Sequence, residues 1–66
     1  MTILQIKLKN ESIKEVAYKN LTINELEKKV RKDNAIKSDY FYIKYANSVV
    51  QILKSEIKKI TLRQIL

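Results

Sequence analysis

The segment from Leu21 to Lys32, LTINELEKKVRK, constrains the fold most, because it carries several local signals for the start of a helix. Thr22 stands where an N-cap belongs, and Glu25 follows three residues later to complete a capping box. Leu21 and Leu26 fall at the two positions of a hydrophobic staple. Apolar residues spaced three and four apart then give the helix one narrow face that must be covered: Ile23, Leu26 and Val30.

The residues before the helix predict a hairpin. Residues 2 to 8 (TILQIKL) and 13 to 19 (IKEVAYK) alternate with the period of half-buried strands. A three-residue loop, Asn10 to Ser12, would set Ile6 opposite Val16 and Leu4 opposite Tyr18. We favour this odd loop, because an even one would place Ile6 opposite a glutamate.

The residues after the helix predict a second hairpin, in DYFYIKYANSVVQILK. A two-residue turn at Asn47-Ser48 would set Tyr45 opposite Val50 and Ile43 opposite Ile52 as a core face. The other face would then be unusually apolar for one that meets water: Tyr40, Tyr42, Lys44, Ala46, Val49, Gln51 and Leu53. Ile36, in the connection 33–39, is expected to tuck under the end of the helix.

The tail, SEIKKITLRQIL, fits two interpretations. It can form a turn at Ser55 to Ile57 followed by a short strand through Ile60 and Leu62, or a helical turn with a second capping box. We favour the strand. The order of elements then predicts a single α+β domain over residues 1 to 66, with two hairpins and one helix packed on one face of a mixed sheet.

The segment Thr22 to Val50 resembles ubiquitin-like β-grasp domains. Identical or similar residues fall, without a gap, at Thr22, Ile23, Leu26, Lys29, Val30, Ile36, Asp39, Ile43, Tyr45, Ala46 and Val50. The resemblance implies a β-grasp fold and a habit of binding proteins. It implies no conjugation, because the chain has no glycine and ends Gln64-Ile65-Leu66, and Lys44 stands where the central isoleucine of the receptor-binding patch would be.

Composition argues against catalysis. The chain has no cysteine and no histidine, so thiol nucleophiles, thiolate metal sites and the commonest general base are missing. Its carboxylates are better explained as helix-start and turn residues than as a catalytic pair, and a 66-residue domain has little volume for a pocket. We therefore expect no enzyme activity, no cofactor, no metal and no small-molecule substrate. Without a membrane-spanning segment or signal peptide, we expect a cytoplasmic protein.

A formal charge of +7 would ordinarily suggest nucleic acid. Twelve of the fourteen basic residues are lysines, however, and the abundance of Ile, Lys, Asn and Tyr indicates an AT-rich genome, such as a low-GC bacterium, phage or plasmid. Nucleic-acid binding therefore stays the alternative function. Its candidate residues are Lys28, Lys29, Arg31, Lys32 and Lys37, with Lys58, Lys59 and Arg63 in the tail.

The leading expectation is a small regulatory module that binds another protein, or a second copy of itself, through an exposed sheet face. Tyrosine is enriched at protein interfaces, and apolar side chains exposed together usually mark a contact surface. The candidate binding residues are Tyr40, Tyr42, Lys44, Val49 and Leu53.

Overall fold

The computed structural model describes residues 1 to 65, which form one α-helix and five strands. In chain order the elements are β1 (Thr2–Leu8), β2 (Ile13–Tyr18), α1 (Ile23–Asp33), β3 (Tyr40–Tyr45), β4 (Ser48–Leu53), a short 3-10 turn η1 (Lys54–Glu56) and β5 (Ile57–Gln64). The protein is therefore an α+β domain, as predicted.

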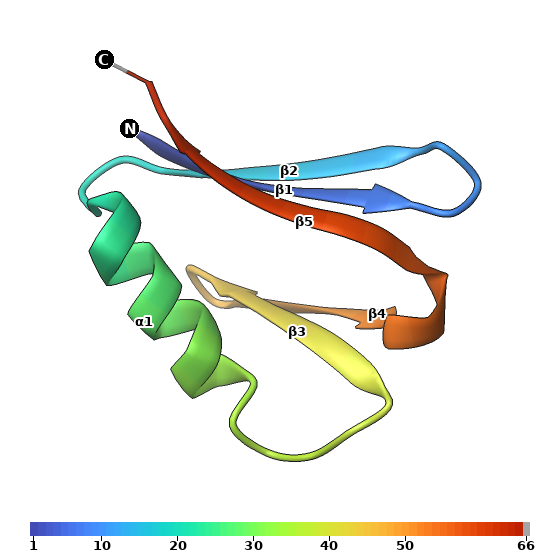
Figure 1. Cartoon of the computed structure of the whole chain (residues 1–66). Helices are drawn as coiled ribbons and strands as arrows, with labels where there is room; N and C mark the ends of the chain where they lie inside the picture. The colour runs from blue at the N-terminus through green and yellow to red at the C-terminus, as the bar shows by residue number, and fades with distance from the viewer. Residues whose placement is uncertain (66) are drawn as a thin grey trace.

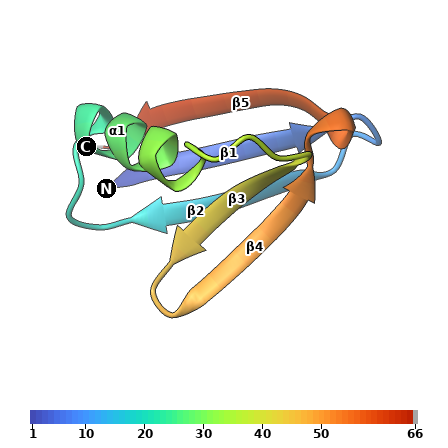
Figure 2. The ribbon, with the colours of Figure 1, turned by 90° about the horizontal axis from the view of Figure 1, so that it is seen from below.

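The elements form two layers (Figures 1 and 2). One layer is a three-stranded sheet in the order β2-β1-β5, and the other contains α1 and the separate β3-β4 hairpin side by side. The hydrophobic core lies between the layers and takes side chains from the helix and every strand. Its buried members are Leu4, Ile6, Leu8, Tyr18, Leu26, Phe41, Ile43 and Ile52, with Val16, Leu21, Val30, Ile57 and Leu62 packed against them.

The start of α1 confirms the capping prediction. The Thr22 hydroxyl accepts a hydrogen bond from the Glu25 N–H at 3.2 Å, and the Glu25 carboxylate accepts one from the Thr22 N–H at 3.0 Å. The Thr2 hydroxyl, buried in β1, donates to the carbonyl of Leu21. Leu26 then points into the core with no exposed surface. These local bonds fix both where the helix begins and where that first turn sits against β1.

The first hairpin has the predicted loop length and strand faces, but the predicted register is wrong by two residues. The loop is Lys9 to Glu11, so Leu4 pairs with Val16 and Ile6 with Lys14. Glu11, the last residue of this loop, takes the left-handed conformation, with a φ of 71°. Ser12 instead donates two hydrogen bonds to the Asn10 side chain, from its N–H at 3.0 Å and its hydroxyl at 2.6 Å.

The second hairpin shows the same kind of error. Its two-residue turn is Ala46-Asn47 rather than Asn47-Ser48, with Ala46 at a φ of 52°. Ile43 therefore pairs with Val50, and Phe41 pairs with Ile52. This register joins two buried residues, Phe41 and Ile52, across the hairpin. Val50 and Tyr45 lie nearer the hairpin tip and keep 42% and 43% of their surface exposed, so they contribute less to the core than predicted.

The strands do not form one mixed sheet, which corrects the expectation for the fold: they form two separate antiparallel sheets. The tail does form a strand, but β5 runs antiparallel to β1, and all strand pairs in the described residues are antiparallel. The cause is the three-residue turn η1, which brings the chain back beside the end of β1: the Lys9 N–H donates to the Glu56 carbonyl at 2.9 Å. A strand that starts there can follow β1 only in the opposite direction. At eight residues it is also the longest of the five strands in residues 1 to 65, rather than a short one.

Candidate functional site

The outer face of the β3-β4 hairpin, called the hairpin face below, carries every predicted protein-binding residue. Alternation along β3 and β4 turns Phe41, Ile43 and Ile52 toward the core, so their strand neighbours point away from it. The register sets these neighbours in three cross-strand pairs: Tyr40 with Leu53, Tyr42 with Gln51, and Lys44 with Val49. The exposed fractions are 40% for Tyr40, 58% for Val49 and 37% for Leu53.

A pocket of about 210 Å³ opens on this face. Tyr42, Lys44 and Val49 from the hairpin line it together with Asp33 and Ile36. The prediction that Ile36 tucks under the helix is wrong: 81% of its surface is exposed, at the rim of this pocket. Ile36 was missed because a lone apolar residue in a polar connection has no periodic pattern that tells an exposed position from a buried one.

Tyr42 is the most firmly held residue of the hairpin face. The Asn34 side chain, just past the end of α1, accepts a hydrogen bond from the Tyr42 N–H at 2.7 Å and donates one to the Tyr42 carbonyl at 3.0 Å. The Tyr42 hydroxyl lies 3.3 Å from the Ser38 hydroxyl. Tyr42 is consequently half-buried, and the free edge of β3 is closed at this residue.

The predicted basic cluster is partly neutralised within the helix itself. Lys29 pairs with Asp33 and Arg31 with Glu27, each at 2.6 Å and each one helical turn apart. Two of the tail's basic residues are paired too, Lys58 with Glu11 and Arg63 with Glu15, both at 3.0 Å. Among the described residues, four candidate lysines have no carboxylate within ion-pair distance: Lys28, Lys32, Lys37 and Lys59.

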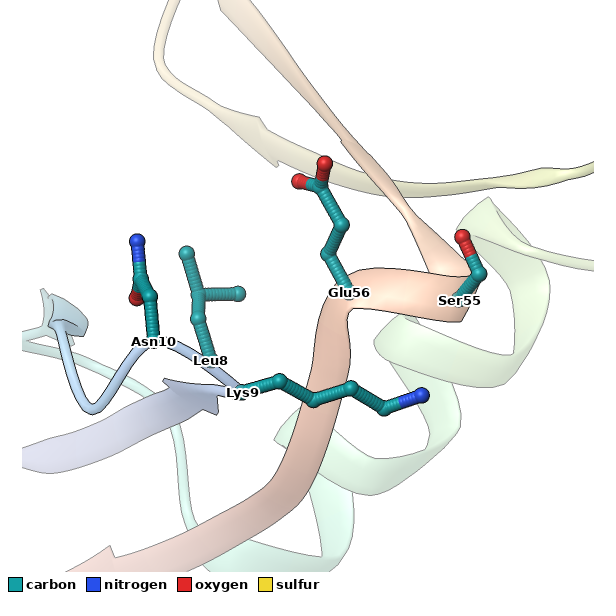
Figure 3. A pocket seen from close by; sticks show the side chains of 5 residues that line it. All are labelled: Leu8, Lys9, Asn10, Ser55 and Glu56. Atoms are coloured by element: carbon teal, nitrogen blue, oxygen red, sulfur yellow. The ribbon is translucent and has the colours of Figure 1, made fainter.

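A second pocket, of about 220 Å³, lies between the first hairpin turn and η1 (Figure 3). Leu8 and Asn10 stand on one side of it, and Ser55 and Glu56 on the other, with Lys9 extending below. It therefore offers one carboxylate, one ammonium, one hydroxyl and one amide. Within residues 1 to 65, no three carboxylates are placed to hold a metal ion.

Two carboxyl groups have pKa values lowered by their hydrogen bonds. The ammonium groups of Lys58 and Lys7 hold the pKa of Glu11 below its ordinary value. The Thr22 N–H, and then the Thr22 hydroxyl, do the same for the pKa of Glu25. Burial raises the pKa of Tyr18, and the nearby charge of Asp33 adds to that effect. The shifts of Glu11 and Glu25 arise in a turn and a helix cap, away from the hairpin face, and the shift of Tyr18 arises mainly from its burial in the core.

Comparison with protein-family models, curated proteins and solved structures gives no match for this chain. In the part of the chain that the structure describes, α1 is too short and too polar to cross a membrane.

Proposed function

We propose that this chain is a small protein-binding module without catalytic activity, and that the hairpin face is its contact surface. The observation that supports the proposal is the two-sided apolar character of the hairpin. Its inner face supplies Phe41, Ile43 and Ile52 to the core, yet its outer face still exposes Tyr40, Val49 and Leu53. The outer residues contribute little to the core, and grouped exposed apolar side chains usually indicate an interface.

The composition of the face suggests the chemistry of the partner. Tyr40 and Tyr42 offer large apolar rings with a hydroxyl at the edge, the type of side chain that often dominates binding energy. Val49 and Ile36 flank the Tyr42 pocket, which suits one apolar side chain of a partner. Lys44 lines the same pocket and would meet a carboxylate there. The proposed partner thus presents an apolar residue beside an acidic one.

The resemblance to ubiquitin-like β-grasp domains enters this proposal only for the helix and the second hairpin, residues 22–50. It supports a general role in protein recognition. It does not extend to the partners of ubiquitin itself, because Lys44 introduces a charge at the position of the central receptor-binding isoleucine.

The test is affinity capture from source cells with the wild-type chain and with Val49→Lys and Leu53→Lys. Both substitutions place a charge on the hairpin face and should abolish capture of a specific protein while the fold, followed by circular dichroism, is kept. Ile13→Lys is the matched control, because Ile13 is 53% exposed but lies on β2, in the other layer. Equal capture by all four proteins would refute the proposal.

Nuclease treatment and a salt titration distinguish protein binding from the alternative function, nucleic-acid binding. Capture that disappears after nuclease treatment, or that weakens steeply as salt rises, would indicate phosphate contacts by the basic residues instead. The lysines to replace in that case are Lys28, Lys32 and Lys37, whose ammonium groups have no carboxylate within ion-pair distance in residues 1 to 65. Capture through the hairpin face should survive both treatments.

A further inference from the structure

The outer edge of β4 is an unpaired strand edge. The Lys54 N–H donates to the Asp39 carbonyl at 2.8 Å, which makes Asp39 and Lys54 a hydrogen-bonded pair of the hairpin. Hydrogen-bonded and non-hydrogen-bonded pairs alternate along an antiparallel ladder. The main-chain N–H and C=O groups of Leu53, Gln51 and Val49 must therefore point away from β3. In residues 1 to 65, these N–H groups and the carbonyls of Gln51 and Val49 have no main-chain partner, whereas the Leu53 carbonyl begins the 3-10 turn η1 and accepts a bond within it.

The position of Tyr42 supports this assignment independently. Tyr42 is the cross-strand partner of Gln51, and both its N–H and its C=O point away from β4, toward the Asn34 side chain. The two outer edges of the hairpin therefore differ in whether their main-chain groups have partners. Asn34 closes the β3 edge, whereas in Figure 2 the β4 edge lies at the outside of the molecule with no element beyond it.

The sequence of β4 lacks the usual protection of an edge strand. Soluble proteins commonly guard free edges with charged side chains, especially lysine. The edge strands β2 and β5 follow this rule, with Lys14 and Glu15 in the first and three basic residues in the second. β4 reads SVVQIL and is the only one of the five described strands without a charge.

We propose that β4 pairs with β4 of a second copy of this chain, antiparallel and centred on Gln51, to give a dimer with one continuous four-stranded sheet. This inference goes beyond the proposed function, because it concerns the edge of the hairpin rather than its outer face. Val49 then pairs with Leu53 of the second copy, Gln51 with Gln51, and Leu53 with Val49.

The edge of β4 is self-complementary, which identifies a second copy of the chain as its partner. The three outward-pointing residues are evenly spaced, so pairing centred on Gln51 sets the N–H group of each one opposite a C=O group of the other copy. Any shift along the strand leaves the groups of Val49 or Leu53 unpaired. The central register also joins apolar Val49 to apolar Leu53 and covers part of Val50, which is 42% exposed.

Charge affects the strength of this dimer but not its register. Each copy carries a formal charge of +7, which opposes association. The register sets Lys54 opposite Ser48 of the second copy, so no lysine of the strand region faces another. Screening of the overall repulsion should make the dimer tighter as salt rises, the opposite of the behaviour of phosphate contacts.

The experiment is sedimentation equilibrium on the purified chain. The wild type should associate to a dimer at the millimolar concentrations used for NMR, and Val49, Gln51 and Leu53 amides should exchange more slowly as concentration rises. Gln51→Pro removes the central N–H of each copy, which has no partner in the monomer, and so removes two intermolecular hydrogen bonds. Since each is worth roughly a two- to tenfold change in affinity, dimerisation should weaken about tenfold or more. Gln51→Thr keeps the N–H and is the matched control.

A charge pair at the symmetry centre tests the register and does not depend on how proline is tolerated. Gln51→Lys and Gln51→Glu should each stay monomeric alone, because like charges then face one another, and should form a heterodimer when mixed. A wild type that remains monomeric at millimolar concentration, or a mixture that does not associate, would overturn the inference. Because no partner protein is present, neither result bears on the proposed function.

Discussion

The side-chain amide of Asn34 is hydrogen-bonded to the main chain of Tyr42 on both sides, at 2.7 Å to the N–H and 3.0 Å to the carbonyl. A third bond, from the same Asn34 nitrogen to the Val30 carbonyl at 2.9 Å, ties it to the last turn of α1. One side chain thus ends the helix, closes the edge of β3 and fixes the position of the hairpin face relative to the helix.

We expect Asn34→Ala to lower the free energy of unfolding by about 1 to 3 kcal/mol, because it leaves partly buried main-chain groups without partners. Chemical denaturation measures this loss, and hydrogen exchange should show faster exchange at the Tyr42 amide. Asn24→Ala is the control, since Asn24 is an exposed helix residue and its replacement should change stability by less than about 0.5 kcal/mol. Equal effects of the two changes would mean that the amide bridge contributes nothing.

Leu26→Ala should cost roughly 2 to 5 kcal/mol and could unfold so small a domain, because Leu26 is fully buried and its loss opens a cavity. Ile36→Ala removes a side chain that is 81% exposed and should leave thermal unfolding almost unchanged. Melting curves of the two variants compare a core site with a surface site directly. A melting temperature for Leu26→Ala close to that of the wild type would contradict the helix orientation.

Acid should weaken the cap of α1. The Glu25 pKa is lowered in the folded protein below its ordinary value of 4.5, so the unfolded chain binds the proton more readily. The resulting stabilisation is complete above the unfolded pKa and is lost as pH falls through the folded one. Glu25→Gln should therefore reduce the loss of stability below about pH 4.5, measured by denaturation across that range. Glu11→Gln should reduce it separately and additively, since its pKa is lowered at a distant site.

Tyr18 should make the protein less stable as pH rises into the alkaline range, the opposite of the effect of Glu25 and Glu11. Burial raises its pKa above the ordinary value of 10.0, so ionisation is harder in the folded protein, and stability is lost as pH rises through the folded pKa. Tyr18→Phe should flatten this loss and have little effect at neutral pH. The ring contact with Tyr45, at 5.2 Å between centroids and 82° between planes, is available to phenylalanine as well. If Tyr18→Phe loses stability at alkaline pH as steeply as the wild type, Tyr18 is not the cause of that loss.

Features encoded within a few consecutive residues could be predicted well. The helix start followed from Thr22 and Glu25, because a capping box is made by residues three apart. The face assignments of both hairpins also followed, since alternation determines parity. The registers did not, because parity is unchanged when a turn moves by one residue and shifts the pairing by two. Without glycine, nothing in the sequence marked Glu11 and Ala46 as the residues with positive φ.

Contacts between segments that are distant in the sequence could be predicted less well. The direction of β5 depends on how the three residues of η1 turn the chain, and periodicity carries no information about that direction. The five candidate binding residues do share one face, as alternation along β3 and β4 requires. The Asn34 bridge, which holds Tyr42 in that face, could not be foreseen, because an asparagine after a helix looks like an ordinary helix end.

The antiparallel pairing of β1 and β5 sets how the protein responds to mechanical force. The Ile65 N–H donates to the Met1 carbonyl at 2.9 Å, so the two ends of the described chain lie side by side. Tension applied between them would open the β1-β5 ladder one pair at a time, starting at Thr2 and Gln64. A parallel pair would instead resist in shear, with all its hydrogen bonds loaded together. This domain should therefore peel open at low force, and the first core residues to lose their cover would be Leu4 and Ile6.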